Sequence, residues 1–239
     1  MSVEIDFSSL SKTELTEMRE AGLAVVNCHR VLAKTSDNIV GELLRDYDEF
    51  FEWDHYPDGD VYDFESHGQY YYHAHPKEER SGEHGHFHTF LRPEGMPPGI
   101  RPAVVEGFTM PDDPDDALSH LAAISMDPKG FPIKLFTTNR WVTGEVWYEA
   151  RDVNRFLHRF EIDLAHPSYI VNIWVTNMIT MFRPQIRELT QLRDKTVAEW
   201  KKKYPDRDVF EDRELEVTSE CSVDLDSQMA SIEAALAEK

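Results

Sequence analysis

The spacing of hydrophobic residues divides the chain into segments with two different periods. Apolar residues three and four positions apart recur over residues 11–53, which is typical of helices that bury one face. Two helices are expected there, the second reaching Phe51. A second helical region is expected over residues 143–203, where the first helix runs to about Ala165. A last helix is expected over residues 226–238.

Shorter segments with alternating or β-branched residues predict strands between and after these helices. Turn-rich sequences, such as residues 55–60, separate them. The expected strands cover residues 69–75, 84–92, 118–126, 131–138 and 215–223. The pattern predicts one α+β domain over residues 1–239, with helices at 11–53, a sheet at 69–138, helices at 143–203 and a terminal strand and helix at 213–238. The sheet is expected to be antiparallel, with four to five strands and a histidine-rich hairpin packed against the N-terminal and C-terminal helices.

The composition is that of a folded and strongly acidic protein. Hydrophobic residues make up 41% of the 239 positions and aromatic residues 11%, which is enough for a sizeable core. The chain has 45 acidic and 25 basic side chains, so its net charge is −20. Such a surface repels phosphate backbones and anionic lipids. We therefore expect a small-molecule substrate rather than a nucleic-acid or membrane partner, with the oligomeric state left open.

The cysteines and the apolar segments indicate the compartment. Cys28 and Cys221 are the two cysteines and form no Cys-x-x-Cys pattern, which excludes a thiolate zinc site and a thioredoxin-like motif. The acidic N-terminus does not have the pattern of a signal peptide. The most apolar stretch, residues 169–182, is shorter than a membrane span. We expect a cytoplasmic protein with reduced thiols.

The histidines are concentrated in one short segment. Five of the eleven fall within sixteen residues and alternate with other residues: His73, His75, His84, His86 and His88. Residues two apart on a strand project from the same face, so a hairpin can direct several imidazoles toward one point. The segment therefore predicts a metal site, without naming a reaction.

The register of the hairpin decides whether these side chains meet. Pairing the apolar faces of the two strands places His73 opposite His86 and His75 opposite His84, with all five histidines on the other face. Directly opposed Cβ atoms are then about 5 Å apart, close enough to share a metal. A register shift of one residue would divide the histidines between the two faces.

Imidazoles with one carboxylate and open coordination positions suit Fe(II), Mn(II) or Zn(II). Glutamates of the connecting loop, with Glu79 first, can supply that carboxylate. The candidate ligands are His73, His75, His86 and His88, then His84 at the loop edge, Glu79 and His120. The alternative is a hydrogen-bonded histidine face without a metal.

His120 alternates with Ala122 and Ile124 in an apolar segment, as expected of a histidine on the core face. If its strand neighbours the hairpin, His120 becomes a further ligand or a proton shuttle. A polar stripe from Asn172 to Arg187 on a later helix either lines a ligand pocket or bonds to neighbouring backbone.

Other residues are candidates for substrate contact and proton transfer. Asn139 and Arg140 lie between a strand end and a helix, where anionic groups are often held. The alternative for them is a capped connection with Arg140 in solvent. Tyr71 and His88 are expected to transfer protons beside the metal.

The histidine segment resembles, in part, the first motif of the cupin family: a glycine, His-x-His, a glutamate and a later glycine. The matching residues are Gly68, His73, His75, Glu78 or Glu79, and Gly85. This resemblance covers less than a tenth of the chain and implies that His73, His75 and one of the glutamates bind a metal. The run Tyr-Tyr-Tyr-His-Ala-His-Pro with Glu-His-Gly-His-Phe-His-Thr-Phe also resembles an uncharacterised bacterial family of unknown function, which implies no activity.

Three functions are compatible with these patterns. The first is a metal-dependent enzyme, hydrolytic or oxidative, acting on a small and possibly anionic molecule. The second is a non-catalytic metal-binding or sensing protein with a coordinatively closed site. The third is a metal-free α+β interaction module. No nucleophile elbow, phosphate loop or dinucleotide fingerprint competes with them.

Overall fold

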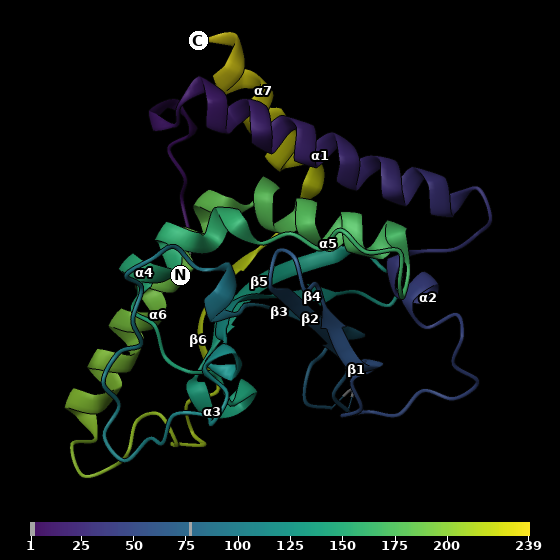
Figure 1. Ribbon diagram of the computed structural model, residues 1–239. Helices are drawn as coiled ribbons and strands as arrows, with labels where there is room; N and C mark the ends of the chain where they lie inside the picture. Colours follow the sequence, from purple (N-terminus) through teal and green to yellow (C-terminus); the bar gives the residue numbers. More distant parts are fainter. Residues whose placement is uncertain (1–2, 77) are drawn as a thin grey trace.

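A six-stranded antiparallel sheet forms the centre of the protein (Figure 1). The computed structural model describes residues 3–76 and 78–239. The strands lie side by side in chain order, so neighbours in the sheet are also neighbours in sequence. They are β1 Tyr56–Tyr62, β2 Gly68–His73, β3 Gly85–Leu91, β4 Ser119–Met126, β5 Pro132–Thr138 and β6 Val217–Ser222. The α+β class and the antiparallel sheet are confirmed, and the expected four to five strands are corrected to six.

The additional strand is β1, in a segment that the sequence pattern assigned to a loop. It pairs with β2 through Tyr56 opposite Tyr72 and Val61 opposite Tyr70, with a bulge between these two pairs. The bulge leaves an exposed stretch in the middle of the strand. Inward and outward positions do not alternate along β1, and its sequence contains turn-forming residues. For this reason the sequence pattern indicated a loop.

The helices lie mainly on one side of the sheet (Figure 1). They are α1 Lys12–Ala33, α2 Ile39–Leu43, α3 Arg140–Thr143, α4 Ala150–Phe156, α5 Tyr169–Met181, α6 Arg183–Lys203 and α7 Leu225–Ala237. Short 3-10 turns are η1 Phe7–Ser9, η2 Pro93–Gly95, η3 Pro114–Asp116 and η4 Leu157–Arg159. Helix α5 covers the sheet and contacts α1 on its outer side, while α6 packs on β5 and β6. Within the described residues, no helix is long and apolar enough to cross a membrane.

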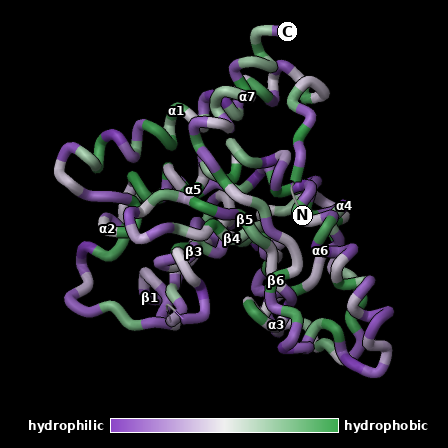
Figure 2. Tube along the Cα trace, turned by 180° about the vertical axis from the view of Figure 1, so that it is seen from behind, coloured by the Kyte–Doolittle hydropathy of each residue, from purple (hydrophilic) through white to green (hydrophobic). Residues whose placement is uncertain are grey.

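The core lies between the sheet and α5. Trp174 of α5 is fully buried, and its ring lies 5.4 Å from that of Phe87 in β3. Phe87 shares its face of the sheet with Tyr70, Ile124 and Leu135 through the register of β2 to β5, and all four are fully buried. Helix α1 alternates between hydrophobic and hydrophilic residues along its length (Figure 2), as expected of an outer helix that buries one face.

Two expected helices are much shorter than the sequence pattern suggested. The helix expected to reach Ala165 is interrupted because Gly144 adopts a left-handed conformation with φ of 66° and ends α3. The buried, non-helical residues 145–148 then lead into α4. The helix expected to reach Phe51 ends at Leu43, and Phe51 itself is 55% exposed.

Candidate metal centre

The sheet face opposite the helix-covered core carries the histidines. In the β2–β3 register, His73 lies opposite His86 and Tyr71 lies opposite His88. This confirms the expected pairing of His73 with His86. The exposed fractions are 8% for His73, 1% for His86 and 0% for His88, so this face is covered. Strand alternation therefore separates an apolar face from a face of imidazole and phenol groups.

Three imidazoles converge at one end of this second face. The Nε2 atoms of His73 and His86 lie 2.8 Å apart. His75 follows the end of β2, and one nitrogen from each of His73, His75 and His86 lies within 4.8 Å of the others. Metal–nitrogen bonds of about 2.0–2.1 Å place three tetrahedral ligands about 3.3 Å apart. The three side chains therefore need only small movements to bind one ion, and we call them the three-histidine group.

Two carboxylates orient the rings of this group. Glu83 Oε1 lies 2.6 Å from Nδ1 of His86, and Ser125 Oγ donates to Glu83 Oε2 at 2.5 Å. Glu79 Oε2 lies 3.3 Å from Nδ1 of His75. A carboxylate at Nδ1 holds the proton there and leaves the lone pair on Nε2. Glu79, expected as a ligand, and Glu83 thus contact Nδ1 of His75 and of His86.

Burial keeps the imidazoles of His73 and His86 neutral. It lowers the pKa of His86 to about 4, although the bond to Glu83 acts in the opposite direction. Burial and then the charges of its histidine neighbours hold the pKa of His73 far below its ordinary value. Burial alone would raise the pKa of Glu83, but its hydrogen bonds from His86 and Ser125 lower it. Neutral imidazole is the form that binds metals, so these side chains are ready to bind near neutral pH.

A surface pocket of about 390 Å³ borders the three-histidine group. Among the residues that line it are His75, Glu83, Arg80 and Lys134. Arg80 forms ion pairs with Glu216 and, at 3.9 Å, with Glu83. The pocket gives a small molecule access to the edge of the group and surrounds that route with charged side chains.

A second buried pair of histidines lies deeper on the same face. Nδ1 of His88 and Nε2 of His120 are 3.0 Å apart. The register shifts between Thr89 and Phe90, so Phe90 faces His120 and Leu121 has no counterpart in β3. This bulge moves His120 to the histidine face, and the expectation that it shares the apolar face of Ala122 is wrong. Nε2 of His88 has no hydrogen-bond partner among the described residues.

His84 does not join the other four histidines of the segment. It precedes the first residue of β3, and its Nδ1 lies 2.7 Å from the hydroxyl of Tyr72. Its ring also contacts Phe50. Because Tyr72 belongs to the apolar face, the expectation that all five histidines share one face is wrong. Strand β2 ends at His73, so the expected pairing of His75 with His84 is absent from the registered pairs of the described strands.

Asn139 and Arg140 lie away from the pocket beside the histidines. Asn139 is fully buried, accepts from the backbone N–H of Arg140 and donates to the carbonyl of Val209 at 2.7 Å. The guanidinium of Arg140 pairs with Glu211 and lies 4.6 Å from the ring of Phe108. These contacts hold the start of α3 against the loop before β6, and the Arg140 side chain is 13% exposed and paired rather than in solvent.

Aromatic side chains surround His73 on its remaining sides, and sequence patterns did not identify all of them. Tyr71 is buried, and its ring lies 5.5 Å from that of His73 and 5.1 Å from that of His88. His55 stacks on Tyr71 at 3.7 Å, and its Nδ1 lies 2.9 Å from Asp60. The ring of Trp53 lies 4.1 Å from that of His75. Trp53 and His55 are distant in sequence from the hairpin and lie in segments without a clear period.

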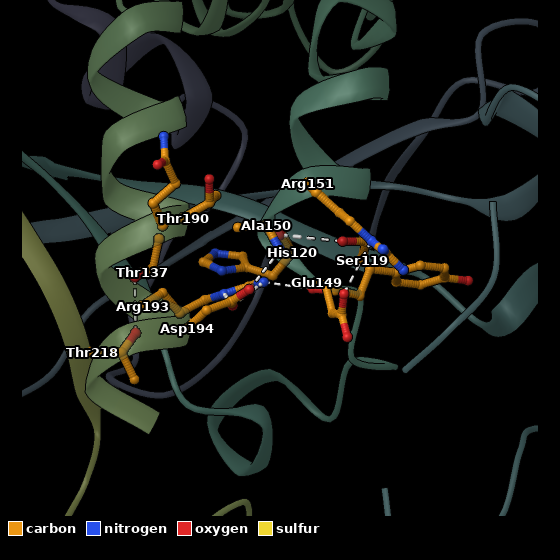
Figure 3. Close-up of polar contacts among 12 residues, drawn as sticks. Ser119, His120, Thr137, Glu149, Ala150, Arg151, Thr190, Arg193, Asp194 and Thr218 are labelled. Carbon is orange, nitrogen blue, oxygen red and sulfur yellow. Dashed lines mark hydrogen bonds and ion pairs between the residues drawn. The ribbon is translucent and has the colours of Figure 1, made fainter. Parts of the chain in front are cut away.

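Charged groups are also buried behind the second histidine pair. Figure 3 shows Arg193 of α6 next to His120 of β4, with Asp194 bonded to Arg193 at 2.7 Å. The backbone N–H of His120 donates to Glu145 Oε2 at 2.7 Å. Burial raises the pKa of the Glu145 carboxyl to about 7, and burial lowers that of His120 to about 3. Tyr71 has a raised pKa from burial and from the nearby carboxylates of Asp60 and Glu145.

A separate group of possible ligands lies at the other end of β1 and β2. His67, Glu94 and Asp115 each offer an atom within 4.8 Å of the others. The hydroxyl of Tyr62 lies 2.8 Å from both His67 Nδ1 and Asp115 Oδ2. Glu94 is exposed. The hydroxyl of Tyr62 joins His67 to Asp115, and the Glu94 carboxylate lies 3.6 Å from Nε2 of His67.

Comparisons with known proteins give a family but no activity. No curated protein and no solved structure matches the chain. One family model matches residues 19–223, which include the whole hairpin, the pocket residues and both histidine pairs. That family is described as a domain of unknown function, DUF6969, in agreement with the resemblance to an uncharacterised family. The chain therefore belongs to the DUF6969 family.

Proposed function

We propose that the protein is a metal-dependent enzyme that acts on a small molecule, with one divalent transition metal held by His73, His75 and His86. The observation that carries this proposal is the convergence of these nitrogens, with Nε2 of His73 and His86 2.8 Å apart. The carboxylates at Nδ1 of His75 and His86 are the partners that metal-binding histidines usually have. A donor set of three imidazoles favours Zn(II) or Fe(II) over Mn(II), which prefers oxygen ligands.

Three protein ligands leave a coordination position open, as in catalytic sites. A metal at this position would act as a Lewis acid or activate water or dioxygen, so the reaction is hydrolytic or oxidative. The raised pKa of Tyr71 keeps its hydroxyl protonated at neutral pH, so this hydroxyl can donate a hydrogen bond beside His73. His88, the other candidate for proton transfer, contacts both His86 and Tyr71.

The substrate reaches the group through the pocket bordered by His75. Arg80 and Lys134 are the cationic residues there, and they take the place that the sequence pattern gave to Arg140 and Asn139 as contacts for an anionic group. Both cations are paired with glutamates, which a substrate carboxylate would replace. A non-catalytic metal-binding protein is the alternative, and the pocket is the observation that favours the enzyme over it.

Metal analysis of the protein purified without a histidine tag tests the proposal. About one Zn or Fe per chain is expected, together with a rise in melting temperature when chelator-treated protein is reloaded. His73→Ala should lose the metal, whereas His158→Ala, an exposed histidine in η4, should retain it. Absence of stoichiometric metal and of any rise in melting temperature would overturn the proposal.

The Co(II)-loaded protein separates the enzyme from the sensing protein. An open position should bind thiocyanate and change the visible spectrum of the cobalt. A spectrum that does not respond to thiocyanate would indicate a closed site and would favour the non-catalytic alternative.

A further inference from the structure

Trp53 lies at the edge of the three-histidine group with much of its ring in solvent. Its ring centroid is 4.1 Å from that of His75 and 6.5 Å from that of His73. The residue is nevertheless 54% exposed. Phe51, two residues earlier, is 55% exposed. Large aromatic side chains normally bury most of their surface, and those that remain exposed beside a polar site commonly line ligand-binding sites.

The backbone holds Trp53 in this position at a conformational cost. Its φ of 73° lies in the left-handed region, which bulky residues rarely adopt. The N–H of Trp53 donates to the carbonyl of Ala74 at 2.9 Å. Ala74 stands between His73 and His75, so the tryptophan is attached at the segment that carries two of the three imidazoles. Strained residues of this kind are concentrated at functional sites.

His75 has an aromatic neighbour on one side and charged neighbours on another. Its ring contacts the indole of Trp53, and its Nδ1 lies 3.3 Å from the carboxylate of Glu79. The pocket that it borders has the charged side chains of Arg80 and Lys134. A molecule bound at the centre would thus meet an aromatic surface and a charged surface within the length of a small ligand.

We propose that Trp53 determines the specificity of this site, and that the substrate carries a flat unsaturated ring which stacks on the exposed part of the indole while a donor atom of the substrate reaches the metal. This inference rests on the proposed metal centre. Stacking between two rings contributes beyond simple burial and accounts for a preference of about tenfold. A substrate without a ring would leave the aromatic surface unused.

Two hydroxamates test this inference, because they share one metal-binding group and differ only in the attached phenyl or methyl. We expect benzohydroxamate to bind the Co(II)-loaded protein about tenfold more tightly than acetohydroxamate, as measured by titration of the visible spectrum. Trp53→Leu and Trp53→Ala should abolish the preference by weakening only the phenyl compound. Trp53→Phe should keep part of it.

Phe64→Ala is the matched control, since Phe64 is an aromatic residue that is 78% exposed and lies between β1 and β2. It should leave the preference unchanged. Equal affinity for the two hydroxamates in the natural protein would overturn the inference, as would a preference that survives Trp53→Ala. Failure of the protein to take up cobalt would instead overturn the proposed metal centre, so the two failures are distinguishable. Melting temperatures of the variants show whether each is folded.

Discussion

Two buried pairs of histidines lie on one face of the sheet, and their surroundings differ. In the pair formed by His73 and His86, the Nε2 atoms face each other and Glu83 holds Nδ1 of His86. In the pair formed by His88 and His120, a single ring-to-ring contact joins Nδ1 to Nε2, and Nε2 of His88 has no partner among the described residues. The first pair has His75 and a pocket beside it, whereas the second is closed off by Glu145 and α6.

Under the proposed function, this difference would separate a pair of imidazoles that binds a metal from one that does not. A ligand histidine needs a lone pair directed at the centre, and a carboxylate at the other nitrogen supplies that direction. It also needs a route for the ion, which the pocket beside His75 provides. The pair of His88 and His120 has neither feature, so we expect it to act through the first pair and not to bind metal itself.

The largest effect is expected from removing one histidine of each pair. His86→Ala should weaken Zn(II) or Co(II) binding more than about 100-fold, because even the loss of a partner outside the ligands costs about 10–100-fold. His120→Ala should change the affinity less than about threefold. Competition titration with a chromophoric chelator measures both constants. Equal losses in the two variants would show that the pairs form one site.

A smaller effect is expected from the buried carboxyls beside the two pairs. Glu83→Gln removes the negative charge at Nδ1 of His86 and should weaken metal binding about 10–100-fold. Glu145→Gln keeps an acceptor for the backbone N–H of His120. The metal affinity of this variant should stay within about threefold of that of the natural protein. Competition titration with the chromophoric chelator measures the metal affinity of both variants. An unaffected Glu83→Gln variant would mean that the carboxylate does not orient the ring.

The pair formed by His88 and His120 should affect how the free energy of unfolding depends on pH. His120 has a pKa of about 3 in the folded chain, well below the ordinary value near 6.5. Above pH 6.5 both states carry neutral imidazole, so the stability of the folded state is complete. As the pH falls from 6.5 toward 3, the unfolded state takes up a proton that the folded state does not, and the free energy of unfolding falls by about 1.4 kcal/mol per pH unit.

His120→Asn removes this contribution, so the free energy of unfolding should depend less steeply on pH between about 4 and 6, by about 1.4 kcal/mol per unit. The groups that face His120 are His88, Arg193 and Glu145, and the opposite contribution of Glu145 cancels when variant and natural protein are compared. Urea unfolding of the metal-free proteins at several pH values measures the slopes. Parallel slopes would contradict a buried neutral imidazole at this position.

The smallest effect is expected from Ser125→Ala. This change removes the hydroxyl that donates to Glu83 Oε2, a contact two steps away from the ion. Because Glu83 retains its bond to His86, metal affinity should fall only a few-fold. Isothermal titration calorimetry on the reloaded protein can resolve this. A loss as large as that of Glu83→Gln would place Ser125 among the essential contacts.

The sequence alone predicts the fold best where side chains alternate regularly. The apolar pattern of β2 and β3 is enough to pair His73 with His86, because a shift of one residue would place Tyr70 and Phe87 on opposite faces of the sheet. The bulge at Phe90 is a different case. It adds one residue to β4, and no residue type in that segment indicates a bulge. The sequence therefore could not predict on which face of the sheet His120 lies.

The candidate site shows the same limit. His75 and His86 could be identified from spacing, since both belong to the alternating segment. Trp53 reaches the site through a loop that begins after α2, and its position depends on one backbone bond to Ala74. Arg80 lines the pocket because the hairpin loop folds toward β5 and β6, a long-range packing that local sequence does not specify.

The hydrogen bond between His73 and His86 affects how the protein would take up a metal ion. Glu83 fixes the proton of His86 on Nδ1, so the short contact requires that His73 donates from Nε2. The two rings thus bond to each other without an ion. Metal binding by both rings would then require the proton of His73 to move from Nε2 to Nδ1, so that both Nε2 lone pairs could face the ion. The metal recovered from a given host would then reflect which ion that host supplies most readily.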